Sequence, residues 1–277
     1  MPLDPNALLP AVLGLAIGAV MGLTGAGGGV LAVPLLVYAL GMSVQSAAPI
    51  GLLAVGLAAV LGAALGLKAG EVRYKAAALM GTVGLLASPV GLWAASLTDT
   101  RVLSALFAVV LIWVAYNAFR YRPTQGLVEI DTPQEDIKST CPCVRNPKTG
   151  RFVWTWPCAR ALAGSGALAG FMSGLLGVGG GFVLVPALQR FTDLTLQSVT
   201  VTSLAVIAIV STFGVINSAS GGAFDMQLAF VFSTGAMAGM LTGRALSGRM
   251  PIHYLKWSFG LVCLGVAALM VGKAMGH

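Results

Sequence analysis

The stretch GAVMGLTGAGGGVLAVPLL, residues 18–36, recurs as GFMSGLLGVGGGFVLVPAL at residues 170–188. The offset between the two copies is 152 residues, because Gly179 takes the place of Gly27 (179 − 27 = 152). Each copy contains three consecutive glycines with a proline five residues after the last of them. A glycine triplet and a proline at the same spacing, found twice, indicate an internal repeat.

The register of the repeat continues beyond these motifs without a gap. Gln45-Ser46 corresponds to Gln197-Ser198, Gly91 to Gly243 and Phe107 to Phe259. We therefore predict a first membrane repeat over residues 1–119 and a second over 158–277, joined by a polar linker over 120–157. Each repeat contains five apolar segments, the second of which is short, and they are expected at about 7–23, 30–41, 45–67, 74–97 and 101–119, and at about 160–175, 182–190, 195–219, 226–248 and 254–272.

The composition is that of a protein whose solvent is lipid. Hydrophobic residues make up 57% of the 277 residues, charged residues make up 9%, and the mean hydropathy is +0.89. In soluble domains roughly a quarter of the residues are charged. A helix of roughly 20 apolar residues is long enough to cross a bilayer. The fold class predicted is an all-α, polytopic membrane protein, with membrane lipid as its surroundings. The net charge of +7 comes from cations between the apolar segments, so we expect no nucleic-acid partner.

The cations also predict an orientation, because Lys and Arg gather in cytoplasmic loops. Lys68, Arg73 and Lys75 mark one loop as cytoplasmic, whereas its counterpart over 220–225 has an acid and no cation. Equivalent loops then lie on opposite faces, which defines two inverted-topology repeats, as in many secondary transporters. We expect a bacterial inner-membrane protein with both termini in the periplasm and the linker in the cytoplasm.

The glycine triplets are the candidate site. Three glycines interrupt a helix, and a broken helix in lipid is tolerated where protein or a wet cavity satisfies its backbone. The helix after each break presents free N–H groups and the positive end of its dipole, which favour an anion. The predicted backbone cradle is Gly27, Gly28, Gly29, Gly179, Gly180 and Gly181. Side-chain candidates are Thr24, Gln45, Ser46, Ser173, Gln197, Ser198, Thr202 and Ser203, with Asn217 ranked last.

Other patterns in the sequence indicate packing or the absence of a site. Gly18-x-x-x-Gly22 and Gly170-x-x-x-Gly174 predict close helix packing. The glycine clusters lack the spacing of a nucleotide-binding loop, and no hydrolytic or paired-carboxylate constellation is visible, so we expect neither a cofactor nor an enzyme. Cys141, Cys143 and Cys158 in or beside a cytoplasmic linker predict reduced thiols and no metal site, because stable disulfides are rare in the cytoplasm.

The motifs Gly22-Leu23-Thr24-Gly25-Ala26-Gly27-Gly28-Gly29 with Pro34, and Gly174-Leu175-Leu176-Gly177-Val178-Gly179-Gly180-Gly181 with Pro186, resemble those of the TauE/SafE family of sulfite exporters. The runs Thr202-Ser203-Leu204 and Gly70-x-Val72-Arg73 are similar as well. The resemblance covers nearly the whole chain outside the linker. It implies export of a small sulfur-containing anion, such as sulfite or sulfoacetate.

We therefore predict a secondary transporter that exports such an anion by alternating access. Three alternatives stay open at this point: a thiosulfate transporter, a sulfur-relay membrane protein that uses the linker cysteines, and an anion channel. The sequence leaves the coupling ion and the oligomeric state undetermined, and a homodimer is one open arrangement.

Overall fold

A computed structural model describes residues 5–25, 28–120, 143, 155–219, 225–247 and 260–269. Within these ranges every regular element is an α-helix, and the only strand-like pairing is a parallel bridge between Cys143 and Thr192. The all-α prediction is confirmed.

Each half contributes one long helix, one short helix and then further long ones. The first half forms α1 (Pro5–Thr24), α2 (Gly28–Ala39), α3 (Val44–Lys68), α4 (Tyr74–Ser96) and α5 (Thr100–Arg120). The second forms α6 (Trp156–Leu176), α7 (Gly181–Phe191), α8 (Leu196–Ala219) and α9 (Met226–Ser247). A further helical segment covers Gly260–Leu269, inside the range predicted for the last apolar segment.

The segment bounds agree with the predicted ones to within a few residues. The largest shift is at α6, which begins at Trp156 rather than at 160. Thr155 is itself extended, and its hydroxyl accepts a hydrogen bond from the Cys158 N–H (3.4 Å). Pro157 adds a residue suited to a first helical turn. This N-cap, and not the apolar run, sets where α6 starts.

Four helical spans within the described residues are long and apolar enough to cross a bilayer: Ser46–Lys68, Tyr74–Ser96, Leu196–Ile216 and Met226–Leu246. Large apolar side chains also cover the outside of the bundle. Leu86 and Trp93 on α4 are 73% and 66% exposed, and Phe230 on α9 is 68% exposed. Such faces are unfavourable in water and suit lipid, so the chain is a multi-pass membrane protein.

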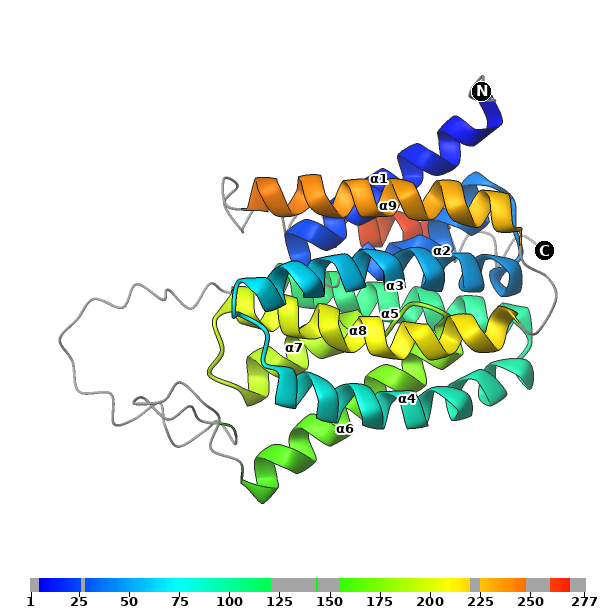
Figure 1. Cartoon of the computed structure of the whole chain (residues 1–277). Helices are drawn as coiled ribbons and strands as arrows, with labels where there is room; N and C mark the ends of the chain where they lie inside the picture. Colours follow the sequence, from blue (N-terminus) through cyan, green and yellow to red (C-terminus); the bar gives the residue numbers. More distant parts are fainter. Residues whose placement is uncertain are drawn as a thin grey trace.

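The helices of the two halves are interleaved. α1 packs along α9, α6 packs along α4, and α3 and α8 pack against each other between these pairs (Figure 1). Because the offset of 152 residues makes α1 the counterpart of α6 and α9 that of α4, exchanging the halves reproduces the same set of contacts. The first helix of each half, α1 or α6, thus packs against a helix of the other half.

Glycines explain the close approach in the outer pairs. A methyl group at Gly22 of α1 would lie 2.6 Å from the Met240 carbonyl oxygen of α9, and one at Gly18 would clash with the Ala236 carbonyl oxygen. The counterparts repeat this, because Gly174 meets the Ser88 carbonyl and Gly170 meets that of Gly84. The packing role predicted for the two G-x-x-x-G pairs is confirmed.

The central pair, α3 and α8, is antiparallel. Gly66 near the end of α3 faces Val201 near the start of α8, Gly56 faces Ser211, and Leu52 faces Gly214. α3 and α8 are counterparts in the repeat, so this pair of equivalent helices runs in opposite directions (Figure 1).

Charged side chains gather at one end of the bundle. The helix termini at that end, where α3, α5, α7 and α9 finish and α4, α6 and α8 begin, include seven cationic residues: Lys68, Arg73, Lys75, Arg120, Arg160, Arg190 and Arg244 (Figure 1). They also carry the acids Glu71 and Asp193. The helix termini at the opposite end carry Asp99, Arg101 and Asp225.

Candidate functional site

The first glycine break follows α1. The helix ends at Thr24, and Gly25 adopts a left-handed conformation (φ +87°) while its N–H still donates to the Met21 carbonyl (2.8 Å). Ala26 and Gly27 lie outside the described residues. α2 begins at Gly28, two residues earlier than predicted, so Gly28 and Gly29 form its first turn. Position 28 has no room for a side chain, because a methyl group at Gly28 would lie 2.5 Å from the Ile17 carbonyl oxygen of α1.

The second break follows α6 and is described in full. Gly177 caps the helix in the left-handed conformation, and its N–H donates to the Ser173 carbonyl (2.8 Å). Gly179 and Gly180 have φ values of +78° and +68°, which residues other than glycine rarely adopt. α7 then begins at Gly181. The triplet therefore divides into two turn residues and one helical residue.

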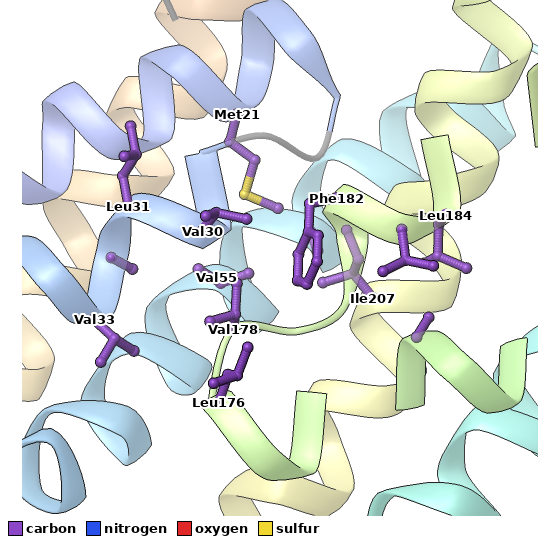
Figure 2. Close-up of a cluster of buried hydrophobic side chains, with 14 of the residues drawn as sticks. Met21, Val30, Leu31, Val33, Val55, Leu176, Val178, Phe182, Leu184 and Ile207 are labelled. Carbon is purple, nitrogen blue, oxygen red and sulfur yellow. The ribbon is translucent and has the colours of Figure 1, made fainter. Parts of the chain in front are cut away.

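The two breaks meet in the middle of the molecule. A methyl group at Gly29 would lie 2.9 Å from the Val178 carbonyl oxygen. Val55 of α3 separates the breaks, since its side chain would lie 3.3 Å from methyl groups placed at either Gly29 or Gly179. Figure 2 shows Val55 with Val178 beside the starts of α2 and α7. Buried apolar side chains fill this region, so the described conformation is closed between the breaks.

The contacts of the breaks repeat across the two halves. Gly25 packs against the Thr200 side chain of α8, and its counterpart Gly177 packs against Ala48 of α3. Thr200 and Ala48 are themselves counterparts under the 152-residue offset. The two breaks are therefore equivalent in their packing, and the first turns of α2 and α7 present N–H groups and positive dipole ends on either side of Val55. Such an arrangement can hold an anion without a buried cation.

Ser211 of α8 is a polar side chain beside a break and is not among the candidates predicted from the sequence. It is fully buried, and its hydroxyl has no hydrogen-bond partner within the described residues. The hydroxyl oxygen lies 3.3 Å from the position of a methyl group at Gly179, which places it beside the second break. The available signal was a hydroxyl residue in an apolar segment; the prediction considered the hydroxyl residues nearer the motifs.

Several of the predicted side-chain candidates lie at helix ends. Thr24 donates its hydroxyl to the Val20 carbonyl (2.8 Å), within its own helix. Ser173 is buried in the last turn of α6, and Gln197 is exposed in the first turn of α8. Ser46 and Ser198 also lie in first helical turns, where their N–H groups donate to Ser43 and Thr195 hydroxyls respectively. The side chains of Gln45 and Asn217 lie outside the described residues.

Thr202 and Ser203 are fully buried and already make hydrogen bonds. The Thr202 hydroxyl accepts from the backbone N–H of Arg73 (3.2 Å), which ties the α3–α4 loop to α8. The Ser203 hydroxyl donates to the Thr200 carbonyl (2.8 Å). Both hydroxyls serve the helix framework in this conformation.

Beside Thr202 lies the ion pair of the α3–α4 loop. Arg244 of α9 donates to the Gly62 carbonyl of α3 (3.1 Å) and approaches the Glu71 carboxylate (3.8 Å). Both side chains are about a quarter exposed, at 25% and 27%. The pair connects the end of α9 with the loop, and its counterpart positions in the other half, Leu92 and Ala223, carry no charge.

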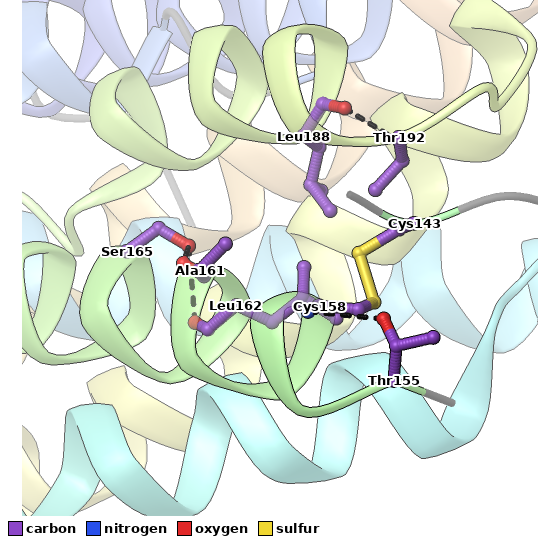
Figure 3. The surroundings of a disulfide bond; sticks show 8 residues. All are labelled: Cys143, Thr155, Cys158, Ala161, Leu162, Ser165, Leu188 and Thr192. Atoms are coloured by element: carbon purple, nitrogen blue, oxygen red, sulfur yellow. Dashed lines mark hydrogen bonds between the residues drawn. A yellow bond between two sulfur atoms is a disulfide. The ribbon is translucent and has the colours of Figure 1, made fainter. Parts of the chain in front are cut away.

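The cysteines overturn the expectation of reduced thiols. Cys143 and Cys158 form a disulfide, and both are fully buried (Figure 3). Cys143 reaches α6 because its N–H donates to the Phe191 carbonyl at the end of α7 (3.2 Å). The prediction rested on the compartment alone and took no account of this docking. Cys263 is a buried free thiol, and Cys141 lies outside the described residues.

No group of three or more His, Cys, Asp or Glu residues that could hold a metal ion occurs in the part of the chain that the structure describes.

Comparisons with known proteins find similar sequences among membrane transporters. The sequence model of the family described as "Sulfite exporter TauE/SafE" matches residues 10–270. A "Probable membrane transporter protein" of Xylella fastidiosa (strain 9a5c) is 30% identical over 266 residues, which cover 93% of this chain and 92% of the relative. A protein with the same description from strain Temecula1 is 28% identical over 262 residues, with 93% and 92% covered. No solved structure matches. This multi-pass membrane protein, with its paired glycine breaks, belongs to the TauE/SafE sulfite exporter family of membrane transporters.

Proposed function

We propose that this transporter exports a small sulfur-containing anion, sulfite or an organosulfonate such as sulfoacetate, by alternating access at the paired glycine breaks. The observation that carries the proposal is the meeting of two helix N-termini, those of α2 and α7, on either side of Val55. Two positive dipole ends facing one region favour a negative solute.

The interleaved packing supports alternating access. α1 with α9 and α6 with α4 form two equivalent parallel pairs, and α3 with α8 lies between them. Inverted repeats allow one such unit to rock against the other, so that the central site opens first to one side and then to the other. The closed packing around Val55 fits an occluded stage of this cycle.

The charge distribution supports the orientation. The end of the bundle with Lys68, Lys75 and Arg244 is the cytoplasmic one, because cations are retained on that side of the membrane. Anions would then load from a positively charged mouth. The Cys143–Cys158 disulfide is the observation that opposes this orientation, because stable disulfides are typical of oxidising compartments.

Transport by the purified protein tests the proposal. In proteoliposomes we expect saturable movement of sulfite or sulfoacetate above that of protein-free vesicles, within a panel that also includes sulfate, thiosulfate and taurine. Movement of none of these anions would contradict the proposed function. A flux that rises linearly with concentration and follows voltage would instead assign a channel.

Glycine variants test the breaks themselves. Gly28→Val and Gly180→Val should abolish transport while the protein still inserts, because each side chain would meet backbone of the preceding helix, the Ile17 and Ala169 carbonyls respectively. Gly41→Val is the matched control for Gly180→Val: its φ of +66° imposes the same backbone strain, but a methyl group there meets nothing within 4 Å. Full sulfite efflux by both break variants would refute the role of the breaks.

A further inference from the structure

We propose that the Ser211 hydroxyl is a direct ligand of the transported oxyanion, which it binds together with the N–H groups at the start of α7. This inference rests on the proposed transport function and assigns the dominant binding contacts to the second half of the molecule. Neither the sequence motifs nor the family match assigns a role to Ser211.

The first argument is the state of the hydroxyl. Buried polar groups in proteins almost always have a hydrogen-bond partner, and those that do not require an explanation. Ser211 is 0% exposed and has no partner within the described residues. A helical hydroxyl can donate to the carbonyl one turn earlier, as Thr212 does to Ala208 (2.7 Å) on the same helix. Ser211 does not use this local solution, so its donor is available to a ligand.

The second argument is its position. The Ser211 oxygen lies 3.3 Å from a methyl group placed at Gly179, one residue before the N-cap of α7. The Ser211 Cβ lies 3.0 Å from a methyl group placed at Gly56 of α3, so Ser211 packs between a glycine of α3 and the second break. An oxyanion at the first turn of α7 would accept from the backbone N–H groups and from this hydroxyl together.

The third argument is the asymmetry of the repeat. The counterpart of Ser211 is Ala59 of α3 (211 − 152 = 59), which is equally buried and has no hydroxyl. The two breaks therefore share a backbone geometry, and the second break alone has a donor at this position. The surroundings, Val55 and Ile207, are apolar and compact. The chemistry fits a small group that only accepts hydrogen bonds, such as sulfite or the sulfonate end of a sulfoacetate molecule.

The test compares Ser211→Ala with Ser233→Ala, using sodium sulfite and sodium sulfoacetate as probes. Ser233 of α9 is the matched control, because it is a buried serine whose hydroxyl likewise lacks a partner within the described residues. Thermal unfolding of detergent-solubilised protein, with and without each anion, accompanies transport in proteoliposomes.

We expect Ser211→Ala to keep the anion-free unfolding midpoint, because it removes a hydroxyl that makes no bond. The anion-induced rise of the midpoint should shrink, and the half-saturation concentration for transport should increase roughly tenfold, the usual cost of one hydrogen bond to a charged group. Ser233→Ala should change neither quantity. The variant Ala59→Ser should not restore binding to Ser211→Ala.

Two outcomes overturn the inference. A Ser211→Ala protein that binds and transports both anions with wild-type half-saturation shows that the hydroxyl is not a ligand, while the transport function stands. A Ser211→Ala protein whose anion-free midpoint falls sharply assigns the hydroxyl to the framework. Failure of the wild-type protein to transport either anion refutes the proposed function itself, so the two failures are distinguishable.

Discussion

At the residue scale, variants of Thr202 can show whether its hydroxyl stabilises the fold or binds the substrate. Its hydroxyl accepts the Arg73 N–H, so Thr202→Val leaves a partly buried backbone donor without this acceptor. We expect the free energy of unfolding to fall by about 1–3 kcal/mol. Thr202→Ser keeps the acceptor and should lose much less. Thermal unfolding in detergent measures both variants.

The same pair of variants tests the ligand role expected from the sequence. A Thr202→Val protein with a wild-type unfolding midpoint and a raised half-saturation concentration for sulfite would assign the hydroxyl to the substrate. A lowered midpoint with unchanged half-saturation would assign it to the link between α8 and the α3–α4 loop.

Thr202 and Ser211 also show why the site could be predicted only in part. The breaks are readable because consecutive glycines are poor helix formers wherever they occur. Which hydroxyl faces a break depends on the rotation of α8. A helix that is apolar on all sides has no periodicity from which to infer that rotation. Sequence reasoning therefore located the glycines and chose Thr202 and Ser203, whereas Ser211 lies beside the break.

At the scale of elements, the parallel pairs α1–α9 and α4–α6 depend on their glycines. Gly170→Ala would press a methyl group against the Gly84 carbonyl of α4, and we expect a destabilisation of about 1–3 kcal/mol, typical of overpacking. Gly164→Ala on the same helix meets nothing within 4 Å and should be neutral or gain up to about 1 kcal/mol of helix propensity. Thermal unfolding of the two variants measures the difference. Equal midpoints would contradict the close packing.

The attachment of the linker to α6 is a second feature at this scale. The Cys143–Cys158 disulfide spans a sequence separation of 15, for which the loop-entropy estimate is about 3 kcal/mol. We expect Cys143→Ser, Cys158→Ser and reductant treatment of the wild type each to lower the unfolding midpoint by a similar amount. Cys263→Ser, at a buried free thiol, should keep its response to reductant. A wild-type midpoint that reductant leaves unchanged would count against the disulfide.

The disulfide marks a limit of sequence reasoning that differs from that of Ser211. Helices were predictable to within a few residues because lipid demands long apolar runs, and α1 to α9 follow those runs. The pairing of Cys143 with Cys158 depends on where the chain before α6 docks, at Phe191 and Thr192. That contact joins positions far apart in sequence, and local composition does not encode it.

For the whole molecule, the orientation of the repeats is the main prediction. Lys68 ends α3 and Asp225 precedes α9, at opposite ends of the bundle. We expect Lys68→Cys to react with a membrane-impermeant thiol reagent only in inside-out vesicles, and Asp225→Cys only in intact cells or right-side-out vesicles. The parent protein, labelled in parallel, provides the baseline for its own cysteines. Labelling of both positions from one side would contradict the inverted arrangement.

The seating of α1 on α9 has a consequence for how the protein is made. α1 is synthesised first. Its partner α9, whose carbonyls face Gly14, Gly18 and Gly22, is synthesised some two hundred residues later. During that interval the face of α1 that carries these glycines must contact lipid or other, temporary helices. Assembly therefore cannot proceed half by half, and a chain truncated at the linker would leave both α1 and α4 without their permanent partners.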